Sequence, residues 1–452
     1  MRILALDQGT TSTRLLQADP DLRVLGQRRH QTFYPGPERV EMDGAEILSH
    51  CRQLLTLAGP ADALGLANQG ESCLAWDRVT KAPLSPVISW QDRRTLGDLA
   101  RLEPLAEEVR ALSGLPLDPY FSAAKLGQLA RAHPGARLGT TDAFLLDNLT
   151  GHFATDRATA SRTGLMNLDR GEWDARLCQI FGVPLGALPE IRPTLAGFGT
   201  AQGAPVTAAI TDQQAALYGH GCRNPGEAKI TFGTGAFALA LTKGRPHPKG
   251  ILPTVAWDLG GITYALDGGV QDAGSAVDWA LRAGIAQSLD DFAGFDTPAI
   301  ARGLAFLPAF SGLGAPHWDR TAAPLIIGMG PDTTRRDLCQ ALLEGLAFQT
   351  AALVAEIAEH VPLMGLFIDG GISSNSYFAG FLATVTQRPV TLAGTQECTA
   401  FGAASLAARA LGVTLTPPPP GPTHQPGPPA PEWAARFDAA LTRARGWRDL
   451  SL

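Results

Sequence analysis

Residues 3–16 read Ile-Leu-Ala-Leu-Asp-Gln-Gly-Thr-Thr-Ser-Thr-Arg-Leu-Leu, and the fold prediction starts from this stretch. One apolar run ends at Asp7 and another begins after Arg14, which predicts strand, tight turn, strand. Gly9 permits the turn, and the hydroxyls and amides that follow are donors suited to phosphate oxygens. Asp7 suits Mg²⁺, which prefers one or two carboxylates plus phosphate oxygens. An ordinary polar hairpin would have a similar composition.

A second copy of this pattern favours the phosphate interpretation. Residues 228–241 repeat strand, glycine turn and strand around Gly233-Thr234-Gly235. Residues 65–70 and 366–371 are also alike, since each is an apolar strand that ends in polar and glycine residues. Similarity at half the chain length indicates duplication of a domain, because solenoid repeats are about 20–50 residues long. We expect two like domains, each offering a phosphate hairpin to a shared cleft.

The overall composition excludes several classes of function. The 452 residues are 45% hydrophobic and 18% charged with a net charge of −6, which is typical of an acidic two-domain globular protein. No long basic run predicts a nucleic-acid or membrane surface, and Asp7 interrupts the apolar N-terminal segment before it resembles a signal peptide. No apolar run approaches the roughly 18 residues of a membrane span. Six separated cysteines indicate reduced thiols in a cytoplasmic protein.

Polar and aromatic side chains follow two predicted strands of the first half. Residues 68–77 bring amides and Glu71, and residues 86–95 bring Trp90 and the run Asp92-Arg93-Arg94. These groups suit a small polyhydroxylated ligand, which needs donors, acceptors and an aromatic face. Solvated loops with a salt-bridged helix start remain an alternative. Tyr120 follows a turn-rich segment, and it either reaches the ligand or packs in the core.

Asp212 lies between the strand predicted at 205–210 and a helix. It is either a helix cap or, with Gln213 beside it, a general base for a substrate hydroxyl. Residues 155–163 are polar, and we interpret them as structural. The domain boundary is predicted near 219–225, which gives domains 1–221 and 222–452. The second domain includes a proline-rich linker at 417–431 and a terminal amphipathic helix at 432–445.

Six motifs, in this order, resemble those of the FGGY carbohydrate kinases, and most closely the glycerol kinase branch. The resemblance covers nearly the whole chain. The motifs are Asp7-Gln8-Gly9-Thr10-Thr11-Ser12, Trp90-Gln91-Asp92-Arg93-Arg94-Thr95, Asp212-Gln213-Gln214-Ala215-Ala216-Leu217, Gly233-Thr234-Gly235, Ser311-Gly312-Leu313-Gly314-Ala315-Pro316 and Asp369-Gly370-Gly371.

The resemblance implies an α/β protein of two ribonuclease H-like domains, of the actin and hexokinase ATPase type, with an interdomain cleft. ATP, Mg²⁺ and a small polyol or sugar would meet in that cleft, and the reaction would be phosphorylation of a primary hydroxyl, with glycerol the leading acceptor. Asp212 is then the catalytic base and Asp7 the Mg²⁺-side carboxylate. The implied polyol pocket consists of Glu71, Trp90, Tyr120, Asp212, Gln213 and Phe237. The implied ATP site consists of Thr10, Thr11, Ser12, Arg14, Gly233, Thr234, Gly274, Gly371 and Asn375.

One departure from the family pattern bears on the acceptor. Glycerol kinases carry an arginine before the pocket glutamate, and this chain has Gly70 there. Without the N–H donors of that arginine, glycerol should bind more weakly or a larger ligand should fit, so tetritols, pentitols and ketopentoses are alternative acceptors.

Other classes of protein need features that this chain lacks or changes. The absence of Gly-Lys-Ser/Thr excludes a P-loop kinase, and a Thr/Ser hairpin replaces the glycine fingerprint of a Rossmann dehydrogenase. A catalytically weak actin-like sugar sensor is the remaining alternative, and retention of Asp7 and Asp212 favours the kinase. The oligomeric state stays open, a homo-oligomer included.

Overall fold

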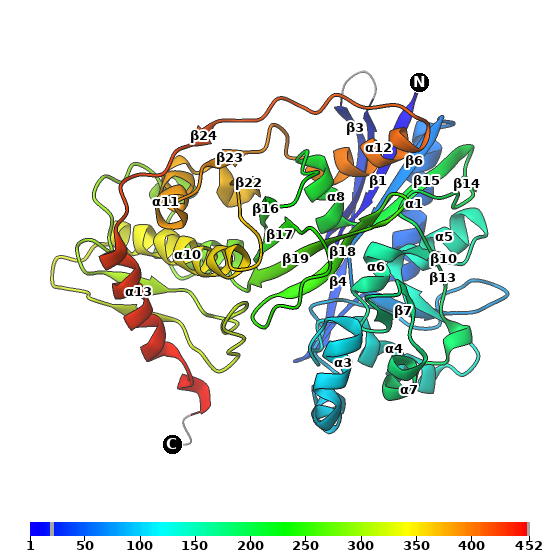
Figure 1. Ribbon diagram of the computed structural model, residues 1–452, viewed down its shortest axis with the longest axis horizontal. Helices are drawn as coiled ribbons and strands as arrows, with labels where there is room; N and C mark the ends of the chain where they lie inside the picture. Colours follow the sequence, from blue (N-terminus) through cyan, green and yellow to red (C-terminus); the bar gives the residue numbers. More distant parts are fainter. Residues whose placement is uncertain (19–21, 450–452) are drawn as a thin grey trace.

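Two β-sheets, each built on one of the repeated hairpins, organise the molecule (Figure 1). The computed structural model describes residues 1–18 and 22–449. The first sheet has the strand order β14-β15-β6-β1-β2-β3, and the second has the order β18-β19-β17-β16-β22-β23-β24. The strands of the first sheet are β1 (Ile3–Gln8), β2 (Ser12–Ala18), β3 (Leu22–Arg29), β6 (Ala63–Asn68), β14 (Thr200–Ala201) and β15 (Ala204–Thr211). Those of the second are β16 (Glu227–Phe232), β17 (Ala236–Leu241), β18 (Leu252–Asp258), β19 (Ile262–Val270), β22 (Gly365–Gly370), β23 (Val390–Leu392) and β24 (Thr423–His424).

The sheets confirm the predicted duplication. β1 pairs with β2 antiparallel and with β6 parallel, and β16 pairs in the same way with β17 and β22. Asp7 lies opposite Arg14 in the first hairpin, and Thr231 lies opposite Phe237 in the second. Each hairpin therefore presents its glycine turn at the same edge of its sheet, next to the carboxyl end of a parallel strand. This edge is where ligands bind in open α/β sheets.

Thirteen α-helices surround the sheets in the described part of the chain. They are α1 (Gly44–Ala58), α2 (Leu96–Arg101), α3 (Ala106–Ser113), α4 (Ser122–Ala132), α5 (Thr141–Thr150), α6 (Arg157–Ser161), α7 (Ala175–Phe181), α8 (Asp212–Gly219), α9 (Gly274–Arg282), α10 (Arg335–Ala358), α11 (Ser376–Thr386), α12 (Cys398–Ala410) and α13 (Pro431–Ala444). The long helix α10 is the one described helix that is apolar enough to cross a membrane, and 78% of its most apolar stretch is buried inside the protein.

Shorter strands lie outside the two main sheets. A third sheet has the order β4-β5-β8-β7-β9, and three further strand pairs lie outside the sheets already named. The third sheet consists of β4 (Thr32–Gly36), β5 (Arg39–Met42), β7 (Cys73–Trp76), β8 (Val87–Ile88) and β9 (Arg137–Thr140). The pairs are β10 (Ala154–Asp156) with β13 (Glu190–Arg192), β11 (Met166–Asn167) with β12 (Glu172–Trp173), and β20 (Ala305–Leu307) with β21 (Leu325–Ile327).

Helix α12 joins the two halves. It belongs to the second half of the chain, yet it packs against β1 and β6 of the first sheet and against α8. A Cβ atom at Gly402 would lie 1.8 Å from the carbonyl oxygen of Ala215, so α12 and α8 approach as closely as a glycine permits. From α12 the chain returns across the molecule to β24 and α13 (Figure 1). Phe437 of α13 stacks on Phe348 of α10 with ring centres 4.7 Å apart, so the last α-helix of the described chain packs against the second domain.

Candidate active site

A cavity of about 430 Å³ lies between the two hairpin turns. It lies within the size range of small-molecule sites, which are typically about 300–1,000 Å³. Ten of the fifteen residues predicted for the polyol and ATP sites line it, although they come from six separate segments of the chain. They are Thr10, Thr11, Glu71, Trp90, Tyr120, Asp212, Gln213, Gly233, Thr234 and Phe237.

The first hairpin turn places two hydroxyl residues at the cavity. The amide of Gly9 donates to the carbonyl of Ser12 at 3.0 Å, which closes the turn and leaves Thr10 and Thr11 at its tip. The Ser12 hydroxyl points instead toward β3, where it accepts a hydrogen bond of 3.0 Å from Gln27 Nε2. Ser12 thus holds the hairpin to the sheet, whereas the two threonines face the cavity.

The second turn is held against the start of α9. The amide of Gly274 donates to the Gly233 carbonyl at 2.9 Å, and the amide of Ala273 donates to the Thr234 carbonyl at 2.8 Å. A Cβ atom at Gly274 would lie 2.6 Å from the Gly233 oxygen. A side chain at 274 would therefore displace the turn.

Three aromatic rings form one wall of the cavity. Trp90 lies with its ring centre 5.4 Å from that of Tyr120 and 6.0 Å from that of Phe237. Trp90 Nε1 donates to Thr10 Oγ1 at 3.0 Å, which ties this wall to the first hairpin turn. The rings offer an apolar face to the C–H surface of a bound polyol.

Asp212 is the first residue of α8, and its carboxylate accepts a hydrogen bond of 2.6 Å from the Gln213 amide. Burial raises the pKa of Asp212 to about 6, and nearby Lys229 limits the rise. The Lys229 ammonium donates to the side-chain oxygen of Gln213 and, at 2.9 Å, to Thr231 Oγ1. A carboxylate with a pKa just below neutrality is mostly ionised at pH 7 and can accept a proton.

Asp7 lies close enough to Asp212 for the two charges to interact. Burial raises the pKa of Asp7 to about 7, and the charge of Asp212 adds to the rise. Two carboxylates that oppose each other's ionisation fit a divalent cation, because the cation would stabilise both charges. Asp7 itself is not among the residues that line the cavity.

A second group, His220, Asp369 and Cys398, has ligand atoms within 4.8 Å of one another. His220 Nε2 is already hydrogen-bonded to Asp369 at 2.5 Å, and burial raises the pKa of the Cys398 thiol well above its usual value.

Five residues assigned to the nucleotide lie outside the cavity lining: Ser12 and Gly274, described above, and Arg14, Gly371 and Asn375. Arg14 donates to both carboxylate oxygens of Glu397 at 3.0 Å, just before α12 begins. Gly371 follows β22. Asn375 Oδ1 accepts from the Phe378 amide at 2.9 Å as the cap of α11, and Asn375 Nδ2 donates to the Phe292 carbonyl at 2.7 Å. Asn375 therefore already has bonds to the protein through both ends of its amide.

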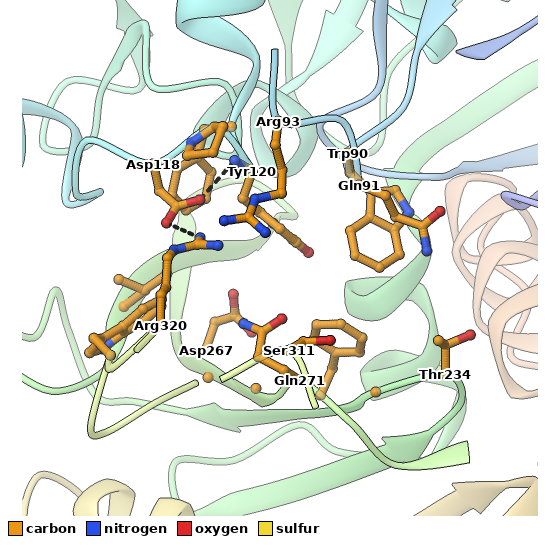
Figure 2. A pocket seen from close by; sticks show the side chains of 18 of the residues that line it. Trp90, Gln91, Arg93, Asp118, Tyr120, Thr234, Asp267, Gln271, Ser311 and Arg320 are labelled. Atoms are coloured by element: carbon orange, nitrogen blue, oxygen red, sulfur yellow. Dashed lines mark hydrogen bonds and ion pairs between the residues drawn. The ribbon is translucent and has the colours of Figure 1, made fainter. Parts of the chain in front are cut away.

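An adjoining cavity of about 270 Å³ shares Trp90 and Tyr120 with the first (Figure 2). Asp118 forms an ion pair across it with Arg320, which comes from the second half of the chain. Arg93 points into this cavity from the opposite side to Gln271 and Ser311. The neighbouring Asp92 and Arg94 form a salt bridge at 2.7 Å, as expected if this run only starts a helix and binds no ligand.

The sequence interpretation missed a charged group in the middle of the site. Arg162, in the segment interpreted as structural, lines both cavities, and so does Asp267 on β19. Arg162 Nε contacts Glu71 Oε1 at 2.6 Å, and Arg162 Nη2 contacts Asp267 Oδ2 at 2.7 Å. A lone arginine beside hydroxyl residues gives no pattern, but an unpaired Glu71 in a polar pocket would have indicated that a cation must lie nearby.

Comparisons with known proteins bear on the family and the fold. Sequence models of the FGGY family of carbohydrate kinases match residues 2–219 (N-terminal domain) and 228–411 (C-terminal domain). The glycerol kinase of Alkalilimnicola ehrlichii is 41% identical over 91% of this chain and 90% of its own length. The crystal structure of Plasmodium falciparum glycerol kinase with ADP superimposes with a TM-score of 0.90 at 27% identity, over 98% of each chain. A xylulose kinase from Rhodospirillum rubrum superimposes with a TM-score of 0.84 at 25% identity, over 98% of this chain and 97% of that one.

Proposed function

Because the chain belongs to the FGGY family of carbohydrate kinases, we propose that it transfers the γ-phosphoryl group of ATP to a primary hydroxyl of glycerol or of a similar small polyol. The enzyme is an ATP-dependent phosphotransferase with an alcohol as acceptor, as the family and the two-domain fold show. The observation that carries the proposal is the convergence of ten predicted ligand residues on one cavity between two hairpin turns.

In the proposed reaction, Asp212 accepts the proton of the acceptor hydroxyl as that oxygen attacks the γ-phosphorus. The Asp212 carboxylate lines the cavity and is mostly ionised at neutral pH, since its pKa is about 6. The position of Asp212 at the start of α8 keeps its carboxylate next to the Gln213 amide. Phosphoryl transfer depends mainly on such positioning and on charge stabilisation, because little covalent chemistry is left for the protein.

The hairpin turns would hold the phosphates of ATP. Thr10 and Thr11 from one turn and Gly233 and Thr234 from the other supply hydroxyl and amide donors at the cavity. Gly274 keeps the second turn in place, and Gly371 and Asn375 would shape the adenosine end. Arg14 and Ser12 would act from behind the turn, through Glu397 and Gln27.

Mg²⁺ fits the carboxylate side of this site, and Asp7 would hold it. When bound, the ion would neutralise charge on the phosphate oxygens. The charge of Asp212 adds to the raised pKa of Asp7, so a cation beside Asp7 would stabilise its carboxylate.

The polyol would lie against the aromatic wall. Trp90, Tyr120 and Phe237 would face its carbon chain, while Glu71 and Gln213 would accept or donate to its hydroxyls. Glycerol is the leading acceptor because the similar curated proteins are named glycerol kinases. Gly70 and the adjoining cavity of about 270 Å³ favour a longer polyol or ketose as the second candidate.

We also place the enzyme in the cytoplasm. All six cysteines are buried free thiols, which is typical of proteins in reducing compartments.

The direct test compares ADP release from Mg²⁺-ATP with and without glycerol. A kinase should release ADP many-fold faster when its acceptor is present. If neither glycerol nor any other small polyol or ketose raises ADP release above the rate without an acceptor, the proposal is rejected and a nucleotide-binding sensor is favoured.

A further inference from the structure

The main cavity contains an imbalance of charge. Three carboxylates, Glu71, Asp212 and Asp267, line it, and Arg162 is the one arginine or lysine among its described lining residues. A polyol offers hydroxyls that can donate to carboxylates, but it also needs donors for its own oxygens. Arg162 is therefore the strongest donor available to a ligand in this cavity.

Arg162 is held in one orientation by partners from both halves of the chain. Its Nε contacts Glu71 Oε1 at 2.6 Å, and its Nη2 contacts Asp267 Oδ2, on β19, at 2.7 Å. The guanidinium also lies over the Phe121 ring, 5.4 Å from the ring centre. With 6% of the side chain exposed, the group has little freedom to turn away.

The third nitrogen of this guanidinium has no partner. Arg162 Nη1 is buried and makes no hydrogen bond to any described residue. A buried donor left unpaired costs about 1–3 kcal/mol, and more for a charged group, so such atoms need a reason. Arg162 lines both cavities, so its side chain borders the space that a ligand would fill.

Position 70 cannot supply this donor. A Cβ atom at Gly70 would lie 2.8 Å from Thr211 Oγ1, so any side chain there would require Thr211 to move. Glu71 follows with a φ of 61°, an uncommon value for a residue other than glycine. Glu71 itself pairs with Arg162, so neither position 70 nor position 71 offers a free donor to a ligand.

We propose that Arg162 determines acceptor specificity by donating through Nη1 to a hydroxyl of the polyol that does not react. This inference rests on the proposed function and adds a contact to the same pocket. Asp212 accepts the proton of the reacting hydroxyl, and Arg162 donates a hydrogen bond to another oxygen of the same molecule. The acceptor class is thus a polyol or ketose with at least one oxygen besides the phosphorylated one.

The test compares the wild type with Arg162→Gln and removes hydroxyls from the ligand. We would measure the KM and kcat for glycerol and the inhibition constants of propane-1,2-diol and propane-1,3-diol against it. Each diol lacks one hydroxyl of glycerol. If another polyol is the better acceptor, its deoxy analogues take the place of the diols.

The KM for glycerol should rise about 10- to 100-fold in Arg162→Gln, because a hydrogen bond to a charged group is lost. The diol that lacks the hydroxyl bound by Arg162 should inhibit both enzymes within about threefold of each other. The inhibition constant of the other diol should rise in Arg162→Gln by about the same factor as the KM for glycerol. This selective pattern distinguishes a ligand contact from a purely structural role.

Arg157→Gln is the matched control. Arg157 also lies on the α6 segment and forms an ion pair with the second half of the chain, through Asp258, but it does not line either cavity. Its substitution should leave all the ligand constants within about threefold. If Arg162→Gln shows no cooperative thermal unfolding, Arg162→Lys keeps a cation between the two carboxylates and undergoes the same comparison.

Equal losses for glycerol and both diols, or an unchanged KM for glycerol, would overturn the proposal. A wild-type enzyme that phosphorylates no polyol would instead reject the proposed function itself.

Discussion

Replacing Asp212 with asparagine removes one proton acceptor and changes almost nothing else in the cavity. The amide has the size of the carboxylate, and its oxygen can still accept the 2.6 Å hydrogen bond from the Gln213 amide. A positioned general base typically contributes about 10²- to 10⁴-fold in rate. We therefore expect kcat for polyol phosphorylation to fall by that factor, while the affinity for ATP changes little.

The pH dependence of the wild type follows from the same carboxylate. The pKa of Asp212 is about 6, so the fraction able to accept a proton falls as pH falls through 6. Burial raises the pKa values of Asp7 and Glu71 to about 7, so the acidic limb of the profile belongs to the group of carboxylates together. Activity should rise with pH between about 5.5 and 7.5 and then level off.

The assay is coupled ADP release at saturating glycerol between pH 5 and 9, with ATP affinity measured separately by calorimetry. Asp156→Asn is the matched control, because burial also raises the pKa of Asp156 to about 7, yet this side chain caps α6 and does not line the cavity. The control should keep the wild-type rate and profile. If Asp212→Asn retains more than about a tenth of the wild-type kcat, Asp212 is not the base.

Three further substitutions test other parts of the account. Gly402→Ala should lower the free energy of unfolding by about 1–3 kcal/mol in urea titrations, because its Cβ would lie 1.8 Å from the Ala215 oxygen. Gly97→Ala, with open space around it, should be nearly neutral. Equal effects of the two substitutions would contradict the close contact between α12 and α8. Gly274→Ala should raise the KM for ATP about tenfold, or about 1.4 kcal/mol, because the new side chain displaces the Gly233 turn. The KM for glycerol should rise much less. An unchanged KM for ATP would show that this turn does not belong to the nucleotide site. Asp7→Asn should raise the Mg²⁺ concentration for half-maximal activity about 10- to 100-fold in a magnesium titration, and an unchanged midpoint would exclude Asp7 as a metal ligand.

The duplicated core could be predicted because its signal is local. Apolar runs around glycine turns at 3–16 and 228–241 have the length and pattern of strand hairpins, and both form as expected. The strands predicted at 65–70 and 366–371 form as β6 and β22, and each pairs with the first strand of its hairpin. The residues that converge on the cavity were found through motifs in the order that the family uses.

The contacts that depend on distant partners could not be predicted in the same way. An alanine-rich helix such as α12 gives no sequence signal of which sheet it will cover. Arg162 stood in a polar segment, and its role depends on Glu71 and Asp267, which are 91 and 105 residues away in the sequence. Asn375 was assigned to the nucleoside, whereas its hydrogen bonds are already used to cap α11 and hold Phe292.

Product analysis tests the central claim most directly. The enzyme would be incubated with Mg²⁺-ATP and, separately, glycerol, dihydroxyacetone, tetritols, pentitols and ketopentoses. Specificity constants would come from ADP release, and the phosphorylated carbon from ³¹P and ¹³C NMR. We expect one phosphate on a primary hydroxyl of a small polyol or ketose, with ADP formed in equal amount. ADP release without any phosphorylated acceptor across the whole panel would contradict it.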